Sequence, residues 1–150
     1  MHLTLSFCGN VSLDSEERLR KNLLAISWKA FFLPLLGLGK FPAKGLPSIL
    51  WIGVGSGHPH LFQLHKRVQE AALASGIEPD LKPYHPHVTI ARCRNISEQL
   101  VQPFLKSNAN FDAGILRVES FCLFSSRLLP EGSVHTEELV CPSNRTPPNV

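Results

Sequence analysis

The sequence predicts an α+β fold built on antiparallel sheets. Segments with strand character follow one another along the chain, and only two long segments show the apolar spacing of an amphipathic helix. Strands that follow one another without a helix between them pair antiparallel, whereas parallel strands need a long crossover. At 150 residues the chain is long enough for one domain with a substantial core and too short for two ordinary ones.

The first expected elements are a strand and a helix. Residues 2–8 alternate between the two sides of a strand, and a Gly-Asn turn follows them. The helix starts near Asp14, where Asp14 and Glu17 have the spacing of a capping box. Its expected inward side chains are Leu19, Leu23, Leu24 and Ile26.

The middle of the chain predicts a hairpin and a second core helix. Residues 31–36 and 49–54 have strand character, and the Gly- and Pro-rich stretch between them predicts a hairpin with a long connection. In residues 58–76 apolar side chains recur at helical spacing up to Gly76, a natural stop. The side chains expected to face the core are Leu61, Leu64, Val68 and Ala72.

Strands dominate the remainder of the chain. The alternation after Pro86 predicts a strand at residues 87–91. A short helix at residues 97–102 is expected to end at Pro103, because proline interrupts the helical hydrogen-bond ladder. Two further strands are expected around residues 116–124 and 134–140.

The composition indicates a single cytoplasmic domain, with residues 1–140 forming the domain and residues 141–150 a disordered tail. The net charge of +3 favours a phosphate-bearing partner but is far weaker than the footprint of a duplex-DNA-binding protein. The four cysteines are widely scattered, which predicts neither a zinc site nor a disulfide framework. No apolar run approaches the ~20 residues that a membrane span requires, and the N-terminus lacks a signal-peptide pattern, so no membrane partner is expected.

A short motif occurs twice. The stretches HLTL at residues 2–5 and HVTI at residues 87–90 both read histidine, apolar, threonine, apolar. On a strand, the histidine and threonine of each copy share one face while the apolar pair faces the core. Either histidine taken alone is more often a surface or structural residue. Two copies on expected strands are a stronger signal, because a pseudo-twofold fold would bring them face to face.

The duplicated motif fits acid and base catalysis on a phosphodiester. Two imidazoles with intrinsic pKa values of about 6.5 can hold opposite protonation states near neutral pH, so one accepts a proton from water while the other donates one to a leaving oxygen. The threonine hydroxyls can donate hydrogen bonds to phosphate oxygens, and a nearby arginine can add charged donors. This chemistry calls for no metal ion and no organic cofactor.

The sequence resembles the two-histidine (2H) phosphoesterase superfamily. Besides the two motifs, the blocks GLGKFP, ILWIGV, HPHVTIAR and FCLFSSRL are similar to those of its bacterial RNA 2',3'-cyclic phosphodiesterases, also called 2'-5' RNA ligases, and they occur in the same order. The resemblance implies a bilobal α+β fold in which two antiparallel sheets form a central cleft, helices cover the outer faces and each lobe carries one motif. It also implies hydrolysis of a terminal 2',3'-cyclic phosphate on RNA to a 2'-phosphate, with 2'-5' ligation as a related activity.

The resemblance implies a role for each polar residue of the motifs. His2 would donate a proton to the leaving 3' oxygen and His87 would activate water, although the residues alone leave open which histidine is acid and which is base. Thr4 and Thr89 would bind the phosphate, and Arg92 would add positive charge beside them. The implied partner is RNA or a nucleotide with a 2',3'-cyclic phosphate, and we expect a monomer without an obligate protein partner.

Two features depart from the family's pattern. Strict alternation puts Arg92 on the face opposite His87, so a bulge or a strand end after Ala91 would be needed to bring it back. The family has a strand and a helix before its first motif, whereas here that motif begins at His2. We therefore expect an N-terminally incomplete domain, with an exposed sheet edge and with aggregation or weak activity as the consequence.

Two alternative interpretations remain. A non-catalytic nucleotide- or RNA-binding module of the same fold would also grip phosphate, and binding without turnover would distinguish it. The cluster of His58, His60 and His65 offers imidazoles for zinc or copper. That cluster lacks a nearby carboxylate or cysteine, however, and the charges of Lys66 and Arg67 would oppose a cation.

Several further side chains are candidates for contacts with RNA. Phe41, in a loop, could stack on a base, as could Phe124, whereas Trp51 is expected mainly to pack in the core. Ser125, Ser126 and Arg127 are candidates for phosphate contacts or for an ordinary turn. His85 is expected to orient the strand or to line the cleft, and His135 to face solvent near the cleft or to lie on an edge strand.

Overall fold

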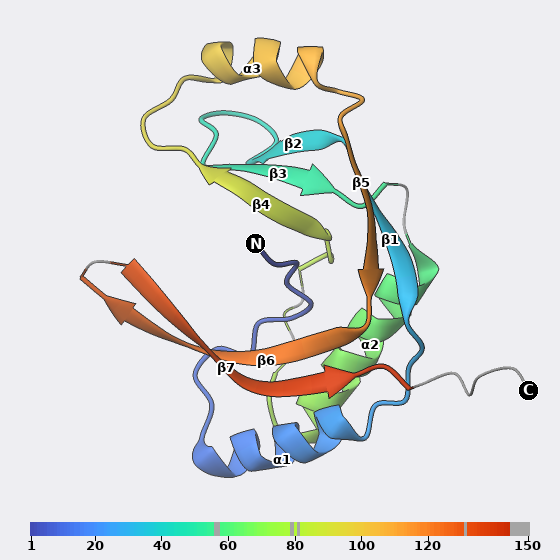
Figure 1. The fold of residues 1–150 in the computed structure, drawn as a ribbon. Coiled ribbons are helices and arrows are strands. Elements are labelled where there is room, and N and C mark those ends of the chain that lie inside the picture. Colours follow the sequence, from blue (N-terminus) through green and yellow to red (C-terminus); the bar gives the residue numbers. More distant parts are fainter. Residues whose placement is uncertain (56–57, 79, 81, 131, 145–150) are drawn as a thin grey trace, which may run out of the picture. The chain divides into compact units, whose positions relative to one another are not determined.

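The structure is a computed structural model that describes residues 1–55, 58–78, 80, 82–130 and 132–144. Within these ranges the chain forms three helices and seven strands (Figure 1). None of these helices is long and apolar enough to cross a membrane. In chain order the elements are α1 (Leu13–Leu24), β1 (Phe31–Leu36), β2 (Leu38–Phe41), β3 (Ile49–Gly53), α2 (Pro59–Ala74), β4 (His87–Arg92), α3 (Glu98–Ser107), β5 (Asp112–Val118), β6 (Ser120–Leu129) and β7 (Gly132–Pro142).

The chain divides into two compact units. Unit 1 contains Met1–Phe7, Leu33–His65 and Asp80–Leu116, and the remaining segments form unit 2. Each unit has its own set of buried apolar side chains, and the four predicted inward positions of α2 are all among them. In unit 1 the set is Leu33, Val54, Leu61, Leu64, Val88 and Val101; in unit 2 it is Leu19, Leu23, Trp28, Phe31, Val68, Ala71, Ala72, Ile77, Phe121 and Cys141.

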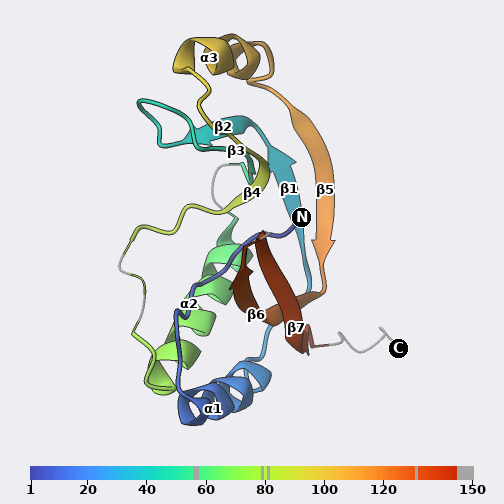
Figure 2. The same cartoon turned by 90° about the vertical axis from the view of Figure 1, so that its left-hand side faces the viewer.

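Unit 1 is organised around an antiparallel sheet in the order β2, β3, β4, and α3 lies over one face of it (Figures 1 and 2). The predicted hairpin of residues 31–36 with residues 49–54 is wrong, because β1 pairs with β5 and the hairpin partner of β3 is β2. The Gly-rich stretch that was expected to be a loop forms β2. There Gly39 leaves room for the ring of Trp51, and the buried Lys40 binds the carbonyls of the loop that follows.

The helix α3 continues through Pro103 to Ser107, so the prediction that it ends at residue 102 is wrong. A proline inside a helix removes one backbone hydrogen bond and crowds the preceding turn. Burial of Val101, which is 6% exposed, stabilises the helix against that loss, because tertiary packing commonly outweighs local propensity.

In unit 2, α1 is capped two residues earlier than the sequence predicts. The Ser12 side chain accepts a hydrogen bond from the Ser15 amide at 3.2 Å, so Ser12 and not Asp14 is the N-cap. Asp14 instead pairs with Arg18 one turn along the helix. Leu24 is 58% exposed, so its expected place in the core is wrong as well.

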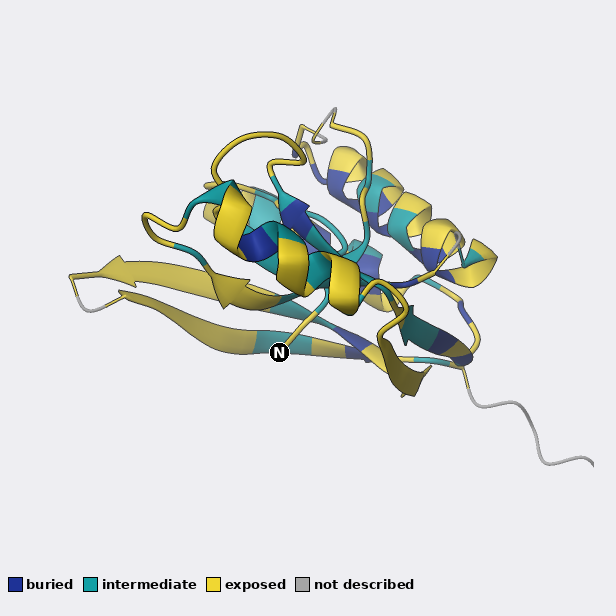
Figure 3. Cartoon of the chain, turned by 90° about the horizontal axis from the view of Figure 1, so that it is seen from above, coloured by how far each residue is buried: buried dark blue, intermediate teal, exposed yellow. Residues whose placement is uncertain are grey.

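The β6–β7 hairpin is exposed over most of its length, and its base joins the core of unit 2 through Phe121 and Cys141 (Figure 3). The predicted disordered tail from residue 141 onward is wrong for residues 141–144. β7 runs through Pro142, and the Asn144 amide donates to the Trp28 carbonyl at 2.8 Å, which anchors this end of the chain to unit 2. Residues 145–150 lie outside the described part.

Candidate active site

The second motif occupies β4, which forms one edge of the unit 1 sheet. Val88 is 8% exposed and packs in the core as predicted, whereas Ile90 is 38% exposed and does not. His87 and Thr89 pair with Gly53 and Trp51 of β3 and are half-buried. The strand therefore holds the histidine and the threonine of HVTI on one face, opposite Val88.

A bulge in β4 brings Arg92 to that same face. Trp51 pairs with Thr89, but its neighbour Leu50 pairs with Ala91, so Ile90 is an extra residue in the ladder. Arg92 then pairs with Ile49, whose side chain points the same way as that of Trp51 two positions along β3. Strict alternation would put Arg92 on the face opposite His87. With the bulge, His87, Thr89 and Arg92 share one face.

Aromatic rings cover the sheet beside His87. The rings of Phe41 and His87 meet edge to face with centroids 5.0 Å apart, and Trp51 lies 5.4 Å from Phe41 and 4.9 Å from His85. Trp51 is half-buried on this face, so the expectation of a core tryptophan is wrong. The sequence offers one sign of this position for Trp51. Gly39 of β2 pairs with Trp51 of β3 and leaves space for its indole.

The ring of His87 is oriented by a backbone carbonyl. Its Nδ1 lies 2.7 Å from the carbonyl oxygen of His85. Because a carbonyl can only accept, Nδ1 carries the proton in this hydrogen bond, and in the neutral ring Nε2 holds the lone pair. Pro86, between the two histidines, fixes its own φ and restricts the backbone before it. The site therefore presents Nε2 as the reactive nitrogen of His87.

The first motif reaches β4 through a single antiparallel β-bridge, between Leu3 and Val88. The predicted strand over residues 2–8 is therefore wrong, since the described backbone there has no continuous ladder. The bridge joins the corresponding apolar residues of the two motifs. Continuing its antiparallel register by one residue in each direction places His2 beside Thr89 and Thr4 beside His87.

Both copies of the motif lie in unit 1, whereas the resemblance implied one in each lobe. His2 is exposed and Thr4 half-buried. With His87, Thr89 and Arg92 on one face of β4 and HLTL bridged to that strand, unit 1 gathers all five predicted catalytic and phosphate-binding residues. Phe41, the predicted stacking residue, lies on the same face because it pairs with Ile49.

The chain is similar to known phosphoesterases over most of its length. The family model LigT like Phosphoesterase matches residues 52–135. RNA 2',3'-cyclic phosphodiesterases of Aquifex aeolicus and Aeropyrum pernix are 34% and 30% identical; the aligned regions cover 91% and 89% of this chain and 74% and 77% of those proteins. The chain belongs to the LigT-like phosphoesterase family. A crystal structure of E. coli LigT complexed with 3'-AMP has a similar fold, with a TM-score of 0.75 at 23% identity over 96% of this chain and 77% of that one.

In this LigT-like phosphoesterase His58, His60 and His65, the alternative metal-binding cluster, do not come together around one point. The rings of His58 and His60 are 5.6 Å apart, whereas Nδ1 of His65 lies 2.8 Å from the carbonyl oxygen of Leu5. Burial, and then the neighbouring His60, lower the pKa of His58. Among the described residues no group of three or more histidine, cysteine, aspartate or glutamate side chains is placed to hold a metal ion.

The remaining candidates lie in unit 2, on the β6–β7 hairpin. Phe124 is 51% exposed, and the Ser125 hydroxyl donates to Glu138 at 2.7 Å. Ser126 and Arg127 are exposed and pair with His135 and Val134 within the ladder, so this segment is a strand and not a turn.

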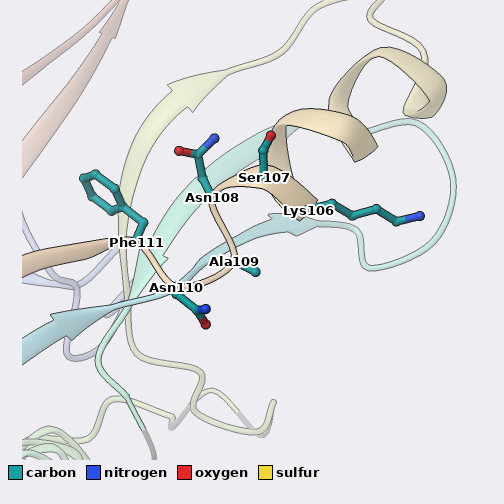
Figure 4. A pocket seen from close by; sticks show the side chains of 6 residues that line it. All are labelled: Lys106, Ser107, Asn108, Ala109, Asn110 and Phe111. Carbon is teal, nitrogen blue, oxygen red and sulfur yellow. The ribbon is translucent and has the colours of Figure 1, made fainter.

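A separate pocket of about 290 Å³ lies at the C-terminal end of α3 (Figure 4). Among the described residues its lining consists of the consecutive Lys106, Ser107, Asn108, Ala109, Asn110 and Phe111. Within this part of the chain, polar groups from other elements do not converge on it, so it lacks the make-up of a catalytic site.

Proposed function

We propose that this family member hydrolyses a terminal 2',3'-cyclic phosphate on RNA to a 2'-phosphate, using the two motif histidines and no metal ion. The observation that carries the proposal is the Leu3–Val88 bridge, which sets the motifs antiparallel with each histidine position beside the other motif's threonine position. The names of the relatives from Aquifex aeolicus and Aeropyrum pernix support the substrate class.

The chemistry requires two proton transfers. Nε2 of His87 takes a proton from water as the water oxygen attacks phosphorus, and His2 gives a proton to the 3' oxygen as the bond from phosphorus to that oxygen breaks. The products are a 2'-phosphate and a 3'-hydroxyl. If the 5'-hydroxyl of a second RNA replaces water, the same steps form a 2'-5' linkage, so ligation belongs to the same proposal.

The other residues on this face of the sheet bind the substrate. Thr4 and Thr89 donate hydroxyl hydrogen bonds to the phosphate oxygens, and the guanidinium of Arg92 neutralises charge that builds up on them. Phe41, which is half-buried on this face, stacks on the base of the terminal nucleotide, because an aromatic face accepts any base.

The test is turnover of an RNA oligonucleotide that ends in a 2',3'-cyclic phosphate, with a chelator present. His87→Ala should lower kcat by roughly 100- to 10,000-fold, the usual contribution of a general base. His60→Ala, at an exposed histidine of α2, is the matched control and should retain activity. Activity that requires added metal, or an active His87→Ala variant, contradicts the proposed mechanism. Binding of the RNA without any turnover identifies a non-catalytic module instead.

A further inference from the structure

The segment that carries His2 and Thr4 has little backbone support of its own. It lacks a continuous ladder, and among the described residues its one backbone bridge is at Leu3. A segment without a ladder keeps its order only where other contacts hold it. Any general acid on this segment therefore depends on what else fixes Thr4 and Leu5.

His65 of α2 makes one of these contacts. Its Nδ1 donates to the carbonyl of Leu5 at 2.8 Å. Its ring is stacked on that of Tyr84, with centroids 3.7 Å apart and planes 7° apart. His65 is half-buried, so the donor is partly shielded from competing water.

Tyr84 makes the adjoining contact. Its hydroxyl donates to the carbonyl of Thr4 at 3.3 Å, and its ring meets Phe62 edge to face at 5.5 Å. Burial raises the pKa of Tyr84, so the hydroxyl keeps its proton and remains a donor across the physiological range. The chain's one tyrosine was not singled out from the sequence, and its place just before the HPH of the second motif is the only hint there.

We infer that His65 and Tyr84 are positioning residues, which together hold the successive backbone carbonyls of Leu5 and Thr4 and so place the first motif against β4. The inference rests on the proposed function. Neither residue exchanges a proton with the substrate. Each acts through a backbone carbonyl of the HLTL segment. The inference also gives His65, a member of the alternative metal-binding cluster, a role in the phosphodiesterase reaction.

The effect should fall on kcat, because a general acid that is displaced by about 1 Å loses roughly 100-fold in rate while the substrate can still bind. His65→Leu removes the donor and keeps an apolar body against Tyr84. His65→Asn keeps an N–H at about the position of Nδ1 and should restore the hydrogen bond to Leu5. Tyr84→Phe removes only the hydroxyl and its bond to Thr4.

The experiment measures kcat and KM on the cyclic-phosphate RNA, the melting temperature, and hydrogen exchange of residues 1–7, all on the full chain. His65→Leu should lower kcat by roughly 10- to 100-fold, more than it raises KM, with faster exchange of the N-terminal amides. His65→Asn should recover most of that loss, and Tyr84→Phe should lower kcat by about fivefold, the worth of one neutral hydrogen bond. His60→Leu is the control and should change neither kcat nor exchange.

The outcomes separate this inference from the proposed function. An active wild type whose kcat is unchanged in His65→Leu overturns the inference alone. The inference is also overturned if His65→Asn fails to restore the kcat lost in His65→Leu, or if that loss of kcat appears only near the melting temperature. Either result would show that the His65 side chain has only a structural role. An inactive wild type contradicts the proposed function and removes the basis of the inference with it.

Discussion

Gly39 shapes the candidate site through the side chain that it lacks. A Cβ at this position would lie 2.1 Å from Cζ2 of Trp51, well inside van der Waals contact, so the indole lies directly against the glycine. Trp51 in turn meets the rings of Phe41 and His85. The arrangement of the aromatic rings around His87 therefore depends on the absence of one methyl group.

Gly39→Ala should displace the indole of Trp51 and disturb the stacking face. On the proposed function, in which Phe41 stacks on the terminal base, such stacking contributes roughly 1 to 3 kcal/mol per base. With the nucleotide 3'-AMP as the probe, we therefore expect the Kd to rise by about tenfold. In a Trp28→Phe background, where Trp51 is the only tryptophan, its emission spectrum should shift.

The control for this prediction is a double-mutant cycle. In a Trp51→Leu background no indole remains to be displaced, so Gly39→Ala should have little further effect on the Kd. An unchanged Trp51 spectrum in Gly39→Ala, or a further full loss of affinity in the Trp51→Leu background, contradicts the role of Gly39.

At the scale of elements, Lys40 connects β2, the loop after it and α3. Its side chain is 4% exposed, and Nζ donates to the carbonyls of Pro42 and Ala43 and pairs with Glu98 at 3.0 Å. A buried ammonium is tolerated only when its donors are satisfied in this way. The pair holds the start of α3 to the end of the strand that carries Phe41.

This connection should weaken in acid. The hydrogen bond from Lys40, followed by that from Gln102, lowers the pKa of Glu98 below its ordinary 4.5. The stabilisation is therefore present above that ordinary value and lost as pH falls through the lower value of the folded state. In urea unfolding between neutral pH and about pH 3, the wild type should lose more stability than Glu98→Gln. Glu70→Gln, whose partner Lys66 is 3.9 Å away on the surface, should behave as the wild type does. If the free energy of unfolding falls equally with pH in the wild type and in Glu98→Gln, the Lys40–Glu98 pair does not contribute the expected stabilisation.

The elements that the sequence predicted are those whose signal is local. The spacing of apolar residues located α2, and the strand character of residues 31–36 located β1. What it missed depends on contacts that are distant in sequence. β2 forms where Gly39 and Trp51 meet, and α3 survives its proline through burial. A bulge was one of the two ways expected to bring Arg92 to the face of His87, but its place at Ile90 is set by pairing with β3.

The same limit applies to the candidate site. The repeat of histidine and threonine pointed to two motifs, and the Leu3–Val88 bridge places them together in unit 1. Nothing local in HLTL indicates that His65 and Tyr84 hold its carbonyls. The roles of the motif residues in catalysis stay predictions until turnover is measured.

For the whole molecule, the important feature is that neither unit is a continuous piece of chain. Each is assembled from three separate segments. The strands β1 and β5 and the helix α2 each begin in one unit and end in the other. Unfolding one unit would therefore break elements that the other also needs. Such sharing favours a single cooperative transition over two independent ones.

The two tryptophans allow this cooperativity to be measured, because Trp28 is in unit 2 and Trp51 in unit 1. In the single-tryptophan variants Trp28→Phe and Trp51→Phe, the urea curve from fluorescence should coincide with that from far-UV circular dichroism. Adding Leu19→Ala, which empties a buried position of unit 2, should lower the free energy of unfolding by about 3 kcal/mol in both backgrounds alike. Leu24→Ala on the exposed side of α1 is the control and should cost less than about 0.5 kcal/mol. If the Trp51 signal keeps its midpoint while the Trp28 signal shifts, the units unfold separately and the shared elements do not couple them.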